Sequence, residues 1–390
     1  MNTINLIMAL HFSNEEFFSR ENKTKQTMKE KGVDALLLFR QESMYWLTGY
    51  DTFGYVFFQC LVFTSNGDKI LLTRSADLRQ AQNTSNIKDI RIWIDKDNNN
   101  PTDELKSILM ELNLENKVIG VEYEAYGLTG KNALKLNHAL NGFAELHDES
   151  FLITKHRLVK SEQEIKYIKK AAELADNALE KGWELAHAGS NESDILTAMQ
   201  GAVFSGGGDY PGNEFIIGSG PDALLCRYFS GRRKLDPIDQ LTLEFAGVYR
   251  HYHSALMRTI PIGKAKNEHL ELYEICLEAL TACENKLKIG NTAGEVFKQH
   301  QIVVDKTKYK SARLNACGYS LGATFAPSWM DWPMLYENNP IKIEKNQVFF
   351  MHMILMHSET ETAMNLGETY IISEKGCERL GKLKLDLVIG

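Results

Sequence analysis

The chain has 390 residues, of which 44% are hydrophobic and 24% are charged, and its formal net charge is −7 at pH 7. This composition is typical of a folded globular protein, and a chain of this length is expected to divide into roughly two or three domains. The acidic balance provides no overall positive field for nucleic acid or for an anionic membrane surface. We therefore expect neither kind of partner.

The first residues, MNTINLIMALHFSNEEFF, contain a short apolar stretch without a basic flank or a small-residue cleavage site. They match neither a secretory signal nor a membrane-spanning helix, which needs about 20 apolar residues. A cytoplasmic location is expected, and Met1 and Met8 both stay open as the start of translation. The six cysteines form no CxxC pair, which favours reduced and mostly buried thiols over a disulfide framework or a zinc cluster.

Residues from about 14 to 150 alternate short apolar segments with amphipathic ones. The apolar segments predict strands, and the run ELKSILMELNL predicts a helix between two of them. The region is thus expected to form an α/β domain with a role in scaffolding or dimerisation, which is favoured over a catalytic one. The predicted strands are VDALLLF, QCLVFTS, DKILLTR, IRIWID and KVIGVE.

The pattern changes near residue 157. Ser161 and Glu164 have the spacing of a capping box, and an apolar stripe at helical spacing follows from Ile165 to Leu179. A long helix is therefore expected to begin a second domain, which gives domains at residues 1–156 and 157–390.

An internal echo is present in the second domain. The segment from Ala178 aligns without gaps with the segment from Ala279, and Gly189 then matches Gly290, at an offset of 101 residues. Each copy predicts a helix, a glycine stop and a second helix, and strands follow each copy. The echo predicts two αβ halves related by a pseudo-twofold axis, with a cleft between their sheets.

The segment LEFAGVYRHYHSALMRT, residues 243–259, has the character of a metal site that has lost part of its ligands. It holds one carboxylate, Glu244, two histidines at alternate positions, His251 and His253, and Ala255 where a second acid would be expected. Residues two apart on a strand share a face, so His253 and Ala255 are predicted to point the same way. Glu244 lies between apolar neighbours, where desolvation would raise its pKa and favour proton exchange near neutrality.

These motifs, in this order, resemble the creatinase/prolidase family, whose catalytic domain has the pita-bread fold. The resemblance covers essentially the whole chain. It implies an α/β (α+β) protein, with an N-terminal creatinase-like α/β domain followed by a pseudo-twofold pita-bread domain, and it implies a homodimer. The segments that carry it are ESMYWLTGYD, HRLVKSEQEIKYIKKAAELAD, GSGPDALLCRY, LEFAGVYRHYHSALMRT, NACGYSLG, NQVFFMHMILM and MNLGETYIISEKGCERL.

The metallopeptidases of this family bind two divalent ions through five side chains, and the resemblance places those positions on this chain. The two aspartates fall on Glu244 and Ala255, the histidine falls on Tyr319, and the two glutamates fall on His352 and Gly367. A two-metal site needs bridging carboxylates, and only Glu244 and His352 remain as donors. We therefore expect no metal and no other cofactor. Creatinase and ectoine hydrolase, of the same family, cleave a C–N bond in small nitrogen-rich substrates without metal.

The expected reaction is hydrolysis of a C–N bond in a small carboxylate-bearing compound that is creatine-, ectoine- or N-acyl amino acid-like. Glu244 is predicted to act as general base or as nucleophile, and His352 to carry the proton to the leaving nitrogen. The alternative for His352 is a buried core histidine. Arg227 is predicted to hold the substrate carboxylate, or instead to pair with Glu214 or Asp222.

Other residues are predicted to contact the substrate, each for a different reason. Tyr249 and Tyr319 could hydrogen-bond an oxyanion or a leaving group, and His253 could bind substrate or only hydrogen-bond within its hairpin. The resemblance places Arg74 where, in the dimers of the family, the N-terminal domain reaches the partner's active site. Trp332, with its aromatic neighbours Trp329 and Tyr336, could close over a cationic or planar substrate or could pack its loop.

Two other functions stay open. A metal-dependent Xaa-Pro dipeptidase, or an aminopeptidase P-like enzyme, would need a rewired single-ion site built from His251, His253, His352 and Glu244. A catalytically inactive pseudoenzyme would bind a small molecule or a protein partner in the same cleft. Metal content separates the two enzymes, and turnover separates both from the pseudoenzyme.

Overall fold

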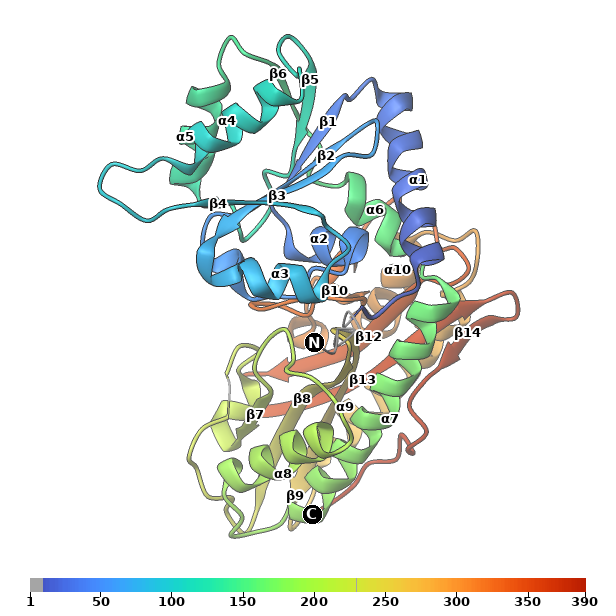
Figure 1. Cartoon of the computed structure of the whole chain (residues 1–390). Coiled ribbons are helices and arrows are strands. Elements are labelled where there is room, and N and C mark those ends of the chain that lie inside the picture. The colour runs from blue at the N-terminus through green and yellow to red at the C-terminus, as the bar shows by residue number, and fades with distance from the viewer. Residues whose placement is uncertain (1–9, 229) are drawn as a thin grey trace. The chain divides into compact units, whose positions relative to one another are not determined.

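The computed structural model describes residues 10–228 and 230–390, so the alternative start positions Met1 and Met8 lie outside the described residues. The chain forms two compact units that divide between Arg157 and Leu158. Figure 1 shows the order of their elements along the chain. Within the described ranges, no helix combines the length and the apolar character that crossing a membrane requires.

The N-terminal unit contains a six-stranded mixed sheet with the strand order β4-β3-β2-β1-β5-β6. All five strands predicted from the sequence are present, and β1 lies at the centre, antiparallel to β2 and parallel to β5. The sixth strand, β6, has partly exposed polar side chains and so gave no apolar signal. The strands are β1 (Ala35–Leu38), β2 (Cys60–Thr64), β3 (Lys69–Arg74), β4 (Asp89–Trp93), β5 (Val118–Val121) and β6 (Glu145–Asp148).

Helices cover both faces of this sheet, because alternate residues of its strands point to opposite sides. Leu37 of β1 packs with Leu105 and Leu136 of α4 and α5, whereas Leu36 packs with Met28 and other apolar residues of the remaining helices. In Figure 1, α4 and α5 lie on one side of the sheet and α1 on the other. The helices are α1 (Asn14–Lys31), α2 (Gln41–Thr48), α3 (Leu78–Thr84), α4 (Pro101–Glu111), α5 (Gly130–Leu140) and α6 (Leu152–Leu158), with short 3-10 turns η1 (Gly54–Val56) and η2 (Ser75–Asp77).

The C-terminal unit contains two helical hairpins that repeat at the predicted offset. The first is α7 (Glu162–Leu185) with α8 (Glu192–Ser205), and the second is α9 (Asn267–Lys286) with α10 (Ala293–Asp305). Between the helices of each pair, Gly189 and Gly290 have φ of 87° and 90°, a conformation that glycine adopts without strain. The predicted capping box also forms, because Ser161 Oγ accepts from the N–H of Glu164 and the Glu164 carboxylate accepts from the N–H of Ser161. The internal echo is thus confirmed.

The two helical hairpins accompany one eight-stranded sheet, with the order β11-β10-β12-β13-β9-β8-β7 and with β14 paired to β13. Its centre consists of two antiparallel hairpins, β8–β9 and β12–β13, one from each half of the repeat. The strands are β7 (Ile216–Ser219), β8 (Asp239–Tyr249), β9 (Tyr252–Ile262), β10 (Ala316–Ser320), β11 (Asp331–Tyr336), β12 (Val348–His357), β13 (Thr362–Ser373) and β14 (Gly376–Arg379), with 3-10 turns η3 (Gly220–Leu224) and η4 (Lys310–Ala312).

Helix α7 decides which face of β8 is covered. A Cβ atom on Gly247 would lie 2.0 Å from the carbonyl oxygen of Ala171 in α7, and a Cβ atom on Gly182 of α7 would lie 3.0 Å from Leu243. The odd-numbered residues of β8 therefore face α7. Glu244 and the other even-numbered residues point to the opposite face.

Candidate active site

A row of side chains crosses the four central strands of the C-terminal unit at Glu244. Glu244 pairs with Met257 of β9, Met257 pairs with Gly367 of β13, and Gly367 pairs with His352 of β12. Residues directly opposite one another on neighbouring strands share a face of the sheet. Glu244 and His352 therefore lie on one face, at opposite ends of this row.

The other predicted positions join the same face. Ala255 pairs with Ala246, two residues from Glu244, and Tyr319 pairs with Phe350, two residues from His352. Because residues two apart on a strand point the same way, the five positions at which the family's metallopeptidases carry ligands share one face here. The register of the strands thus brings the five positions to one face, and the functional roles of the residues there stay predictions.

The residues at these positions do not fit a two-metal centre. A Cβ atom on Gly367 would lie 2.7 Å from the Phe350 ring and 2.9 Å from the Met257 Cβ, so the ring fills the space that a glutamate side chain would need. The Phe350 ring also packs against Tyr319 and His352, with centroid distances of 5.4 and 5.5 Å. Among residues 10–228 and 230–390, no group of three or more His, Cys, Asp or Glu side chains is placed to hold a metal ion.

Glu244 is a buried carboxyl group whose pKa is raised to about 7. Burial in the sheet raises the pKa, and the positive charge of Arg227 and a hydrogen-bonding interaction with the Tyr319 hydroxyl lower it in part. Both the acid and the carboxylate are therefore populated near neutral pH. A group in this state can take up a proton and return it.

Arg227 is the positively charged residue that lowers the pKa of Glu244. Its side chain is exposed, and within the described parts of the chain its guanidinium makes no ion pair or hydrogen bond, either with Glu214 or with Asp222. Its charge nevertheless acts on the pKa of Glu244 and of His352. An exposed arginine whose charge acts on a buried carboxyl group is suited to a carboxylate ligand.

His352 is buried, and its pKa is lowered to about 3, first by desolvation and then by the nearby His300 and Arg227. Its Nδ1 atom is buried and has no hydrogen-bond partner within the described residues. The imidazole is thus uncharged near neutral pH. It can accept a hydrogen bond there, but it does not carry a positive charge to the site.

His253 lies on the Glu244 face, but both of its ring nitrogens are engaged. Nδ1 donates to the carbonyl oxygen of His251 at 2.8 Å, and Nε2 accepts from the N–H of Gly212 at 2.8 Å. The ring is fully buried and desolvation lowers its pKa to about 3. These contacts correspond to the alternative of a histidine that hydrogen-bonds within its hairpin and the adjoining loop.

Tyr249 is not brought to Glu244. Its position is odd-numbered on β8, and its ring packs edge-on against Tyr167 of α7 at a centroid distance of 5.8 Å. It therefore lies on the helix-covered face, where it helps to anchor the β8–β9 hairpin. The register that places Glu244 in the row places Tyr249 on the other side of the strand.

The structure places Trp329 in contact with Tyr319, and the predicted substrate contact of Trp332 stays a prediction. Trp329 is 1% exposed, and its Nε1 donates a hydrogen bond to the Tyr319 hydroxyl at 2.8 Å. Trp332 is half-buried in the edge strand β11, beside Asp331. Trp329 and Phe350 are the contributors that sequence reasoning undervalued. The alternation of residues from His352 could have indicated Phe350, whereas the loop that carries Trp329 gives no such signal.

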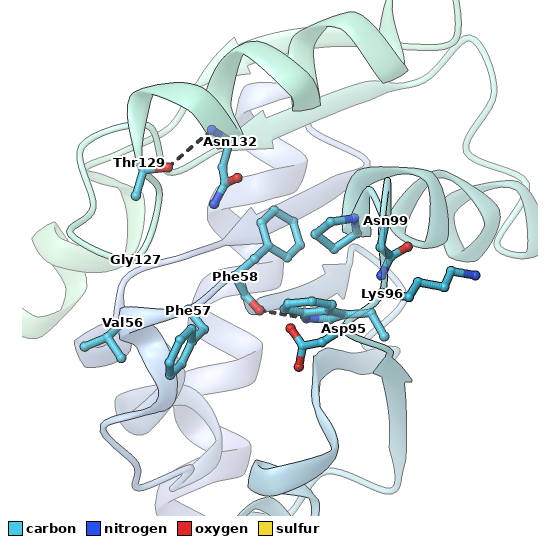
Figure 2. Close-up of a pocket in the computed structure, with 11 residues that line it drawn as sticks. Val56, Phe57, Phe58, Asp95, Lys96, Asn99, Gly127, Thr129 and Asn132 are labelled. Carbon is cyan, nitrogen blue, oxygen red and sulfur yellow. Dashed lines mark hydrogen bonds between the residues drawn. The ribbon is translucent and has the colours of Figure 1, made fainter.

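Arg74 ends β3 in the N-terminal unit. Its guanidinium pairs with Asp95 at 2.7 Å and lies 4.0 Å from the centroid of the Phe57 ring. Asp95 and Phe57 line a pocket of about 390 Å³, with Phe58 and Trp93 on its apolar wall (Figure 2). All of the residues that line this pocket come from the N-terminal unit, and the predicted role of Arg74 at a partner's active site stays a prediction.

Comparisons with known proteins agree with this architecture. The chain matches the model of metallopeptidase family M24 over residues 166–374 and that of the creatinase/prolidase N-terminal domain over residues 20–159. It is 25% identical to ectoine hydrolase of Halomonas elongata, over 98% of this chain and 99% of that protein. It is 23% identical to a Xaa-Pro dipeptidase of Pyrococcus horikoshii, over 94% of this chain and 97% of that protein.

Solved structures show the same fold at lower sequence identity. A prolidase from Thermococcus sibiricus matches with a TM-score of 0.87 and 21% identity, over 97% of this chain and 100% of that one. A Xaa-Pro dipeptidase from Bacillus anthracis matches with a TM-score of 0.83 and 21% identity, over 96% and 99% of the two chains. The predicted pita-bread fold and its N-terminal α/β domain are thereby confirmed. The chain belongs to metallopeptidase family M24, in its creatinase/prolidase branch.

Proposed function

We propose that this protein hydrolyses a C–N bond in a small carboxylate-bearing nitrogen compound, and that it does so without a metal ion. The observation that carries the proposal is the state of Glu244, a buried carboxyl group with a pKa of about 7 at the position of a family metal ligand. Burial raises the pKa of its neighbour Tyr319 well above the ordinary value, which disfavours a phenolate ligand, and its neighbour Arg227 is a cation. A carboxyl group with such a pKa as that of Glu244 can act as a general base near neutral pH.

The residues support a sequence of steps. Arg227 binds the substrate carboxylate and holds the scissile bond over the row that contains Glu244. The Glu244 carboxylate takes a proton from water as the water oxygen attacks the carbon, and Tyr319 donates a hydrogen bond to the carboxylate or to the developing oxyanion. The protonated Glu244 then returns this proton to the nitrogen as the C–N bond breaks, and the uncharged His352 accepts a hydrogen bond from the water or from the substrate.

The relatives support a hydrolase of this kind at a coarser level. Ectoine hydrolase matches nearly the full length of both chains, but so does the Pyrococcus Xaa-Pro dipeptidase. Ala255, Tyr319 and Gly367 stand where the metallopeptidases carry metal ligands. Their presence favours the comparison with ectoine hydrolase, because a metal-dependent dipeptidase needs donors at these positions. The second candidate function is therefore a dipeptidase with a rewired single-ion site.

The first test is the transition-metal content per protomer. Protein purified without a histidine tag or chelator is challenged with manganese, cobalt, iron and zinc, and the retained metal is measured by mass spectrometry. We expect far less than one ion per protomer, because the donor set lacks bridging carboxylates. Near-stoichiometric, tightly held metal would overturn the metal-free mechanism and favour the dipeptidase.

The second test is turnover on a panel of creatine-like, ectoine-like, N-acyl amino acid and Xaa-Pro substrates, with Glu244→Gln as the inactive variant and Glu214→Gln, an exposed glutamate of the same unit, as the matched control. We expect turnover of a non-peptide substrate that Glu244→Gln loses and Glu214→Gln keeps. Turnover of the whole panel at background level would favour a binding protein. We also propose a homodimer on the basis of the family resemblance, and light scattering tests it.

A further inference from the structure

The hydrogen bond between Trp329 and Tyr319 has a fixed direction. Trp329 Nε1 lies 2.8 Å from the Tyr319 hydroxyl oxygen, and an indole N–H can donate a hydrogen bond but cannot accept one. The Tyr319 oxygen is therefore the acceptor, and its own hydrogen is directed to a different partner. Tyr319 lies on the face of Glu244, and its hydroxyl is one of the groups that lower the pKa of the Glu244 carboxyl group, together with Arg227.

We infer that Trp329 is a positioning residue: by occupying an acceptor site of the Tyr319 oxygen, its indole N–H directs the Tyr319 hydroxyl hydrogen at Glu244. The catalytic consequence of this arrangement rests on the function proposed above, whereas the arrangement itself does not. Tyr319 is the residue that touches the reacting group, and Trp329 acts through it.

Trp329 is held in place by contacts on its backbone. Its N–H donates to Asn213 Oδ1 at 3.1 Å, and its carbonyl oxygen accepts from Thr324 Oγ1 at 3.4 Å. A Cβ atom on Gly212 would lie 2.8 Å from the Trp329 nitrogen, so the two loops are closely packed. His253 links them further, because its ring bonds to the N–H of Gly212 and to Thr324 Oγ1. The indole is therefore fixed before any substrate arrives.

Several groups set the pKa of Glu244, and they determine how that pKa would respond if the Tyr319 hydroxyl no longer pointed at the carboxylate. Arg227 and Cys226 act on Glu244 from the segment after η3, Tyr319 acts from β10, and His352 stands on the same row in β12. A hydrogen bond to a carboxylate favours the charged form, so its removal raises the pKa. A hydrogen bond to a charged group in a buried site corresponds to a shift of roughly one pH unit.

The experiment measures the titration of Glu244 without a substrate. Infrared difference spectra of the full-length protein follow the carbonyl stretch of the protonated carboxyl group against pH, and the band is assigned by its loss in Glu244→Gln. The variants are Trp329→Phe, Tyr319→Phe and the double variant, with Trp183→Phe, a half-buried tryptophan of α7, as the matched control. Circular dichroism at each pH verifies that every variant is folded.

We expect Trp329→Phe and Tyr319→Phe each to raise the midpoint, by up to about one pH unit, and the double variant to have the midpoint of Tyr319→Phe. Trp183→Phe should leave the midpoint unchanged. An unchanged midpoint in Trp329→Phe, or additive shifts in the double variant, would overturn the inference. If Trp329→Phe does not fold, benzothienylalanine at this one position removes the N–H while keeping the ring shape. The midpoint of the Glu244 titration in that variant is then compared with the wild-type midpoint in the same way.

This titration separates the inference from the proposed function. A shifted midpoint in a protein that turns over no substrate of the panel would support the role of Trp329 and contradict the hydrolase. Turnover that depends on Glu244, together with an unshifted midpoint, would support the hydrolase and contradict the role of Trp329.

Discussion

Replacing Glu244 with glutamine should stabilise the protein, and the gain should grow with pH. The folded-state pKa of Glu244 is about 7, above its ordinary value of 4.5, so the folded protein binds more protons than the unfolded chain between these values. Stability that depends on the protonated carboxyl group is fully present below pH 4.5 and is lost as the pH rises through 7. Glutamine does not titrate, so Glu244→Gln escapes this loss.

The size of the gain follows from the two pKa values. One pH unit corresponds to about 1.4 kcal/mol, so the difference between 4.5 and about 7 corresponds to about 3 kcal/mol in the free energy of unfolding. Most of it, roughly 2.5 kcal/mol, should develop between pH 5 and pH 8. The acid-sensitive histidines are common to both proteins, so they cancel when the variant is compared with the wild type at each pH.

The assay is urea unfolding of wild type and Glu244→Gln at about pH 5, 6, 7 and 8, with Glu214→Gln as the exposed control. Linear extrapolation gives the free energy of unfolding at each pH. A stability difference that does not change with pH would refute the reasoning, because it would mean that Glu244 keeps an ordinary pKa in the folded state. A difference that shrinks as the pH rises would show the opposite sign of shift, as expected for a carboxylate bound to cations.

Three further predictions follow from the site. Gly367→Ala should destabilise the protein by about 1–3 kcal/mol in urea unfolding, because its Cβ would meet the Phe350 ring, and Phe350→Leu should restore part of the loss in the double variant. His253→Phe should cost about 2–4 kcal/mol near neutral pH, because it removes the buried hydrogen bonds of both ring nitrogens. That cost should diminish as the pH falls from 6.5 toward 3, since the folded-state pKa of His253 is about 3 and its stabilising effect is lost in acid. Arg227→Gln should lower kcat/KM for a carboxylate substrate by about 10- to 100-fold in steady-state kinetics, whereas Arg232→Gln, an exposed neighbour, should not.

The sequence by itself determined the elements and their repetition. The apolar segments predicted the strands, the capping box predicted the start of α7, and the offset of 101 residues predicted the second helical hairpin. Such features depend on residues that are close together in the chain, which is why the sequence reveals them. The motifs also identified Glu244 and His352 as the donors that remain, because the resemblance aligned the ligand positions one by one.

The tertiary structure decided which side chains meet. The register of β8 put Tyr249 on the face of α7, the fold of two loops engaged both nitrogens of His253, and the ring of Phe350 filled the place of a side chain at Gly367. Trp329 contacts Tyr319 from a loop whose conformation cannot be predicted from local sequence patterns. These contacts join residues far apart in the chain, and a shift of one residue in strand register would exchange the two faces. The chemistry of the site therefore depends on packing that only the folded chain defines.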